Sequence, residues 1–147
     1  MSTGPCPEGA YRASVARAET IDEPSNCATV RPLVRAEEDG SSMSMTWVSI
    51  DGRHRPLSSR RSARVYYILS GSLRFVLTGG QPGTLGPGDA LVIPKGCKYF
   101  LEGTGTYLVL NTPAFEPGDD EYAAEGPGPS GESGCPLEPG PEGSPRL

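Results

Sequence analysis

Between residues 52 and 65 the chain carries five arginines and no acidic residue. Arg64, Tyr66 and Ile68 alternate along an apolar run, which places their side chains on one face of a predicted strand. Arg60 lies in the preceding loop, from which its side chain could reach the same space. A guanidinium group repels a metal cation, whereas its planar fork matches a carboxylate or a phosphate. A pocket with Arg60 and Arg64 as its cationic contacts would therefore suit a small anion and not a metal cation.

The arginines of this segment also have a simpler interpretation. A run of charges is usually solvated, so we expect Arg53, Arg55 and Arg61 on the surface, and Arg60 suits the pocket and the solvent equally well. Arg64 differs from these residues, because a buried guanidinium is tolerated only beside an acidic partner or an anionic ligand. Its place on the strand therefore carries the anion hypothesis.

Histidine and cysteine offer no metal site. His54 is the single histidine, and such a residue is more often exposed or hydrogen-bonded than a metal ligand. The cysteines include no pair separated by two residues, which a zinc ribbon would require. We expect no metal, no cofactor and four free thiols, at Cys6, Cys27, Cys97 and Cys135.

Short apolar runs separated by turns rich in glycine and proline make up the middle of the chain. Residues 43–50 alternate large apolar with small polar side chains, as a strand with one buried face does. Gly71-Ser72 predicts the turn of a hairpin, and Asp51-Gly52 marks another turn. With no helical pattern between them, the strands predict an all-β antiparallel sandwich or barrel; they cover residues 29–34, 43–50, 64–70, 73–78, 90–93 and 106–111.

Two blocks of this region resemble the two conserved motifs of the cupin superfamily, spacing for spacing. The blocks are formed by Gly52, Ser58, Arg60, Arg64 and Gly71, and by Gly88, Pro94, Gly96, Tyr99 and Gly103. The resemblance covers residues 43 to 115 and implies an antiparallel double-sheet cupin barrel of jelly-roll type, open at one end. The residues that bind metal in other cupins are replaced here by Ser58, Arg60, Arg64 and Tyr99, so the resemblance implies a cupin without metal.

The resemblance also implies roles for individual residues. Arg60, Arg64, Tyr66 and Ser58 would bind the substrate, and Tyr99 would act as general acid or base. A phenol close to two cationic groups has its phenolate form favoured, which suits proton transfer. Deoxysugar epimerases are cupins that work in this way on anionic substrates, although their histidine base has no counterpart here.

Ectoine synthase is a second cupin to which the chain is similar. Its ending, after the last strand, looks like Asn111-Thr112-Pro113. Its metal-binding glutamate would fall on Arg64, so the resemblance does not carry over its iron chemistry.

Two functions follow from these observations. The first is a metal-independent enzyme, an isomerase, cyclase, dehydratase or lyase, that acts on a small anionic metabolite in a biosynthetic pathway. The second is a non-catalytic cupin that binds a small carboxylate or phosphate as a sensor or carrier. A second titratable group facing Tyr99 would favour the enzyme, whereas a Tyr99 surrounded by aliphatic side chains would favour the binder.

Composition divides the chain into three parts. Residues 28–115 form the predicted cupin domain, and residues 1–27 form a polar N-terminal arm whose order the sequence does not define. Residues 116–147 carry eight acidic residues against one arginine and are rich in glycine and proline. Such a segment buries too little apolar area to offset its ordering entropy, so it is predicted to be a disordered tail.

Charge and hydropathy restrict the partners and the location. The formal net charge of -5 argues against nucleic-acid binding, which requires a basic face. No apolar run approaches the roughly 18 residues of a membrane span. No secretory signal is visible, so we expect a cytoplasmic protein. We also expect a homodimer that pairs through its sheets.

Overall fold

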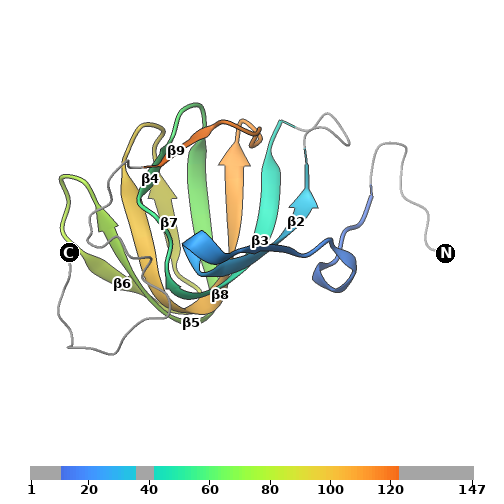
Figure 1. Ribbon diagram of the computed structural model, residues 1–147, viewed down its shortest axis with the longest axis horizontal. Coiled ribbons are helices and arrows are strands. Elements are labelled where there is room, and N and C mark those ends of the chain that lie inside the picture. The colour runs from blue at the N-terminus through green and yellow to red at the C-terminus, as the bar shows by residue number, and fades with distance from the viewer. Residues whose placement is uncertain (1–10, 36–41, 123–147) are drawn as a thin grey trace.

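The computed structural model describes residues 11–35 and 42–122. This part of the chain consists of nine strands and two single-turn 3-10 helices (Figure 1). The elements are η1 (Val15–Arg17), β1 (Ile21–Glu23), η2 (Pro24–Asn26), β2 (Ala28–Val34), β3 (Ser44–Arg53), β4 (Leu57–Ser59), β5 (Ala63–Leu77), β6 (Gly83–Leu85), β7 (Ala90–Ile93), β8 (Tyr99–Thr112) and β9 (Asp120–Tyr122). Neither described helix is long and apolar enough to cross a membrane.

The strands form one antiparallel sheet that curls into a half-barrel (Figure 1). Its order is β1-β2-β3-β8-β4-β9, and β5 pairs with β8 along its whole length and also with β6 and β7. Because β5 and β8 are 15 and 14 residues long, both bend and contribute to the two sides of the half-barrel. The predicted all-β antiparallel barrel is confirmed, with its two layers joined through these long strands.

The predicted hairpin at Gly71-Ser72 is wrong, because β5 continues through this position. Gly71 lies opposite Gly105 with φ +91°, and a Cβ atom on it would lie 2.1 Å from the backbone oxygen of Thr104. Only glycine fits such a crowded left-handed position. The predicted turn at Asp51-Gly52 is wrong for a similar reason, since both residues lie within β3 and pair with β8. These glycines mark bends of the sheet and not reversals of the chain.

Alternation along the strands gives the half-barrel an inner face. Its end nearest the mouth carries the directly paired residues Ser44, Asn111 and Arg64, from β3, β8 and β5. Farther inside, Ile68 and Leu101 are fully buried and belong to the apolar core. The inner face is therefore polar at the mouth and apolar at the closed end, which is the arrangement that a ligand pocket needs.

The ordered sheet extends beyond residues 28–115 on both sides. Strand β1 pairs with β2 through Ile21–Glu23, and β9 pairs with β4 through Asp120–Tyr122. The folded domain therefore continues past the boundary predicted at residue 115. The acidic composition of the following residues is typical of a solvated segment, although they include a strand of the barrel. The tail from residue 123 onward lies outside the described residues.

The cysteines depart from expectation at one position. Cys97 is a free thiol, as predicted, whereas Cys27 is disulfide-bonded, so the prediction of four free thiols is wrong. Cys6 and Cys135 lie outside the described residues.

Candidate functional site

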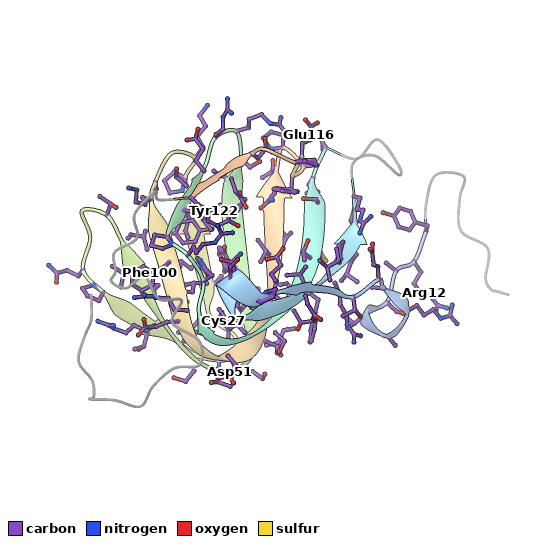
Figure 2. The ribbon with its side chains drawn as sticks, viewed as in Figure 1. Arg12, Cys27, Asp51, Phe100, Glu116 and Tyr122 are labelled. Carbon is purple, nitrogen blue, oxygen red and sulfur yellow. The ribbon has the colours of Figure 1, made fainter. Side chains whose placement is uncertain are left out.

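A pocket of about 300 Å³ lies inside the half-barrel, between the inner face of the sheet and strands β1, β2 and β9. Figure 2 shows the side chains that fill the interior of the curled sheet, with Tyr122 among them. Val30, Val48 and Val109 supply apolar wall. The polar wall includes Glu23, Arg64, Tyr66, Asn111, Asp120 and Tyr122.

A chain of polar contacts runs along one wall of this pocket. The hydroxyl oxygens of Tyr66 and Tyr99 lie 2.5 Å apart. Arg64 Nη1 donates to the Tyr99 hydroxyl at 3.0 Å, and Arg64 Nη2 donates to Asp120 Oδ1 in an ion pair. Four side chains from three strands are thereby linked, in the order Tyr66, Tyr99, Arg64 and Asp120.

The donors and acceptors of this chain limit where its protons lie. Arginine has no acceptor, so the Tyr99 oxygen accepts from Arg64. Within the described residues Tyr99 has one further hydrogen-bond partner, Tyr66, and either hydroxyl can be the donor of that bond. When Tyr99 donates, the Tyr66 proton can be donated into the pocket, which Tyr66 lines. Tyr66 is therefore the hydroxyl that a ligand would meet.

The geometry of the two long strands brings these residues together. Arg64 and Tyr66 lie two residues apart on β5, so they share the inner face. Tyr99 begins β8, which curls until this residue pairs with Leu57 of β4, and Asp120 begins the neighbouring β9. The period of two in the sequence predicted the first two positions, whereas the path of β8 and β9 could not be derived from a local pattern.

Burial controls the charge states of the two tyrosines. Burial raises the pKa of Tyr66 and that of Tyr99, and this effect outweighs the lowering by Arg64. Both side chains are therefore neutral phenols at neutral pH. The expectation that the phenolate of Tyr99 is favoured is wrong, because desolvation of the charged form is the larger effect.

Arg64 and Asp120 form the charged end of the chain. Burial lowers the pKa of Arg64, but the interactions with Tyr66, Tyr99 and Asp120 together raise it by more than burial lowers it. The guanidinium therefore stays charged. Burial raises the pKa of Asp120 and outweighs the lowering by Arg64. A carboxylate of raised pKa that stands beside a permanent cation can accept a proton more readily than an exposed aspartate.

The acidic partner of Arg64 changes the expected chemistry of the ligand. A buried guanidinium required either an acid or an anionic ligand, and Asp120 supplies the acid. The other charged groups on the pocket wall, apart from His54, are Arg35 and Glu23, which also have opposite signs. The wall therefore carries no excess of positive charge among the described residues, and Arg64 alone does not demand an anion.

Two predicted substrate contacts do not reach the pocket. The side chain of Arg60 is 58% exposed and its Nε lies 3.6 Å from Glu121. Ser58 lies between the buried residues Leu57 and Ser59 of β4, so alternation turns its side chain away from the interior. The expected positions of Arg60 and Ser58 in the pocket are therefore corrected.

Tyr99 lies behind the pocket wall and not on it. It is 2% exposed and is absent from the residues that line the pocket, whereas Tyr66 lines it. The predicted role of Tyr99 as the residue that touches the substrate is therefore corrected by its position. Tyr99 can act on a ligand only through the two wall residues that it contacts, Tyr66 and Arg64.

Arg61 is exposed, as expected, and it also holds the segment before β9. Its Nε donates to Asp119 Oδ1 at 2.9 Å, and its Nη2 donates to the backbone oxygen of Ala114 at 2.9 Å. The hydrogen bond from Arg61 lowers the pKa of the Asp119 carboxyl group. Arg61 thereby fixes the residue next to Asp120.

His54 lines the pocket but is held by the backbone. Its Nε2 accepts from the Leu101 N–H at 3.1 Å, so its Nδ1 carries the proton and donates to the Arg55 oxygen at 2.9 Å. Burial lowers the pKa of His54 to about 4. The side chain is therefore hydrogen-bonded, as expected, and neutral, with both nitrogens engaged.

The donor set of this site does not fit the metal of other cupins. Two of the four ligand positions, Ser58 and Arg60, face away from the pocket, and a third is the cation Arg64. Across the described residues no three His, Cys, Asp or Glu side chains are grouped so that they could hold a metal ion.

A second hollow, of about 530 Å³, lies between residues 11–19 and the edge of β2. None of the predicted site residues lines it, and the residues on its wall are partly or fully exposed. The pocket inside the half-barrel is therefore the candidate site.

Known proteins share this fold. No curated protein matches the sequence. The structure of Pac13, described as a nucleoside dehydratase, is 21% identical, with a TM-score of 0.64 over 78% of this chain and 91% of that chain; the protein is from Streptomyces. KdgF from Halomonas sp. is 18% identical, with a TM-score of 0.63 over 73% of this chain and 96% of that chain.

A protein from Planctomyces limnophilus is 22% identical, with a TM-score of 0.69 over 77% of this chain and 96% of that chain. At these identities the structures establish the fold alone. The family model of the EutQ-like cupin domain matches residues 36–119, more than half of the sequence. The predicted resemblance is thereby confirmed, and the chain belongs to the EutQ-like cupin domain family.

Proposed function

We propose that this cupin is a metal-independent enzyme of the dehydratase or lyase type, acting on a small polar metabolite. The observation that carries the proposal is the hydrogen-bonded chain from Tyr66 through Tyr99 and Arg64 to Asp120. Tyr99 was the residue whose surroundings would separate an enzyme from a binder, and it lies between a second phenol and a paired guanidinium. Two titratable groups on the pocket wall, Tyr66 and Asp120, favour the enzyme.

The two groups are suited to opposite steps of a dehydration. Asp120 removes the proton from a carbon next to a carbonyl group, the bond to the β-hydroxyl oxygen breaks, and Tyr66 protonates the departing oxygen to give water. The Tyr66 phenolate that forms is stabilised by the Tyr99 hydroxyl and by Arg64. The enzyme is restored when the proton passes from Asp120 back to Tyr66, so the net products are an unsaturated carbonyl compound and water.

The structural neighbours offer independent support for this class of reaction. Pac13 is described as a nucleoside dehydratase, and variants of it at one histidine and two tyrosines were solved with uridine. The three substituted positions of Pac13 are 13 and 34 residues apart in chain order. His54, Tyr66 and Tyr99 are 12 and 33 residues apart. We therefore propose a nucleoside-like substrate.

One difference sets this site apart. The two nitrogens of His54 are both engaged by backbone groups, so His54 is not the base of the proposed reaction. Asp120 takes that role because it lines the pocket and its pKa is raised by burial. His54 instead supports the ring of Tyr99, whose centroid lies 5.6 Å away in an edge contact.

The proposal is tested by following small β-hydroxy carbonyl compounds, with and without a pyrimidine base, by NMR in D2O. We expect the wild type to exchange the α-proton and to release water from at least one compound. Tyr66→Phe should lower the rate about 100-fold or more, the usual contribution of general acid catalysis. Tyr67→Phe is the matched control, because Tyr67 is the next residue and is exposed. Equal loss in both variants, or none in Tyr66→Phe, contradicts the proposal.

The alternative is a cupin that binds a small carboxylate or phosphate without turnover, as a sensor or carrier. The charge on Arg64 is the feature that supports it, although Asp120 already compensates that charge. A thermal-shift screen of carboxylates and sugar phosphates separates the two functions, since a ligand that binds the folded state raises the midpoint. An anion that stabilises the protein and is recovered unchanged favours the sensor.

A further inference from the structure

Two buried polar atoms beside the pocket lack a hydrogen-bond partner among the described residues, Arg64 Nε and Asn111 Oδ1. Arg64 is 5% exposed and Asn111 is 6% exposed, and both line the pocket. They are directly paired on neighbouring strands, Arg64 on β5 and Asn111 on β8. A buried donor and a buried acceptor are therefore carried by two directly paired residues on the pocket wall. Neither atom takes part in the hydrogen-bonded chain from Tyr66 to Asp120.

Leaving such groups unpaired costs free energy, and folded proteins rarely do so without a reason. Directly opposite residues of an antiparallel pair have Cβ atoms about 5 Å apart, so one planar ligand edge can reach both side chains. Such an edge must offer an acceptor to the Nε–H of Arg64 and a donor to Oδ1 of Asn111. An amide or imide edge, O=C–N–H, offers this pattern.

We infer that Arg64 Nε and Asn111 form a specificity pair that recognises the imide edge of a pyrimidine base. The inference rests on the proposed function, since it names the substrate class of the same pocket. A neutral edge is preferred over an anion because Asp120 already compensates the charge of Arg64. The pocket also has the apolar wall against which a flat ring can pack, formed by Val30, Val48 and Val109.

The inference distinguishes two ligands of nearly the same shape. Uridine offers a carbonyl acceptor beside an N–H donor. Cytidine reverses this pattern, so its exocyclic amino group would face Arg64 Nε with one donor against another. We expect wild-type protein to bind uridine at least tenfold more tightly than cytidine, as measured by calorimetric titration. 3-Methyluridine, which lacks the N–H, should lose a similar factor.

Asn111→Leu removes the acceptor and keeps the volume. We expect this variant to lose the preference for uridine over cytidine, and to unfold at a higher temperature than the wild type without ligand, because a buried unpaired acceptor is gone. A merely structural role of Asn111 would lower that temperature. Thr112→Val, at the exposed neighbouring position, should change neither quantity.

Several outcomes would overturn the inference: equal affinity for uridine and cytidine, no binding of uridine by the wild type, or an intact preference in Asn111→Leu. The comparison of uridine with cytidine uses wild-type protein, so it tests the inference even when the Asn111→Leu variant fails to fold.

The binding assay and the turnover assay test different claims. A protein that prefers uridine but dehydrates nothing refutes the proposed reaction alone, whereas a dehydratase that is indifferent to the base refutes this inference alone.

Discussion

Arg64, which is buried, and Asp120, which is partly buried, form an ion pair between residues that lie 56 positions apart in the sequence. The pair joins β5, in the middle of the barrel, to β9, a short strand that follows the predicted domain. Asp120 compensates the charge of Arg64, the guanidinium that strand alternation predicted on the inner face of the barrel. The same pair provides the proposed base, so one contact serves both the stability of the barrel and the chemistry of the pocket.

Asp120→Asn should destabilise the protein by about 3 to 5 kcal/mol, the range for removing one partner of a buried ion pair. The guanidinium of Arg64 would stay charged and lose its only acidic contact among the described residues. Denaturant unfolding measures the change. Glu121→Gln, next along β9, is the control, because its contact with Arg60 is exposed on both sides and should contribute less than about 1 kcal/mol. Similar losses in both variants would contradict the buried pair.

His54 should make the stability depend on pH below neutrality. Its pKa is lowered from 6.5 to about 4 in the folded protein, so between these values the unfolded chain binds more protons than the folded one. The contribution of neutral His54 to the free energy of unfolding is therefore complete above pH 6.5. It is lost as the pH decreases toward 4, by about 3 kcal/mol in total. Comparison of unfolding free energies for wild type and His54→Gln at several pH values isolates this contribution, because the carboxyl groups titrate in both proteins. Parallel curves would show that His54 titrates normally.

The sequence predicted the parts of this structure that depend on local alternation and on motif spacing. The inner face of Arg64 and Tyr66 follows from a period of two, and the glycine and proline positions implied the cupin fold. Asp120 was missed because an acidic residue in a segment rich in glycine resembles a solvated tail. Its role depends on the pairing of β9 with β4, a contact between distant residues that no local signal encodes.

The same limit explains the errors at the glycines and at β4. Gly71 has the composition of a turn, and only its contact with Thr104 on β8 shows that it is a bend. Ser58 occupies a ligand position by spacing, but the short strand β4 turns its side chain outward. Asn111 belongs to a segment that is similar to the ending of another cupin. That its side-chain oxygen is buried without a partner among the described residues is known only from the structure.

The outer face of the sheet predicts a homodimer. Val92 on β7 and Tyr67 on β5 are 63% and 42% exposed, and Tyr67 lies opposite Leu108, which in turn lies opposite Trp47 on β3. An apolar face of this kind usually marks an interaction site. We expect a dimer by light scattering, and a monomer for Val92→Lys. Glu121→Lys, on β9, is the control and should stay dimeric; a monomeric wild type would contradict the prediction.

Replacing the whole ion pair should separate its structural role from its proposed chemical role. In Arg64→Met/Asp120→Leu no buried charge is left uncompensated, and apolar side chains of similar size often stabilise as well as the pair they replace. We therefore expect unfolding free energies within about 2 kcal/mol of the wild type, compared with the larger loss for Asp120→Asn alone.

Activity should not recover with stability in this double variant. Its pocket keeps Tyr66 and Tyr99 but lacks both the proposed base and the cation that stabilises the Tyr66 phenolate, so turnover should fall at least as far as in Tyr66→Phe. Denaturant unfolding and the NMR assay on the same preparations measure the two quantities. A stable double variant that retains turnover would remove Asp120 from the mechanism, and one as unstable as Asp120→Asn would show that packing around the pair, and not its charge, holds β9 against the barrel.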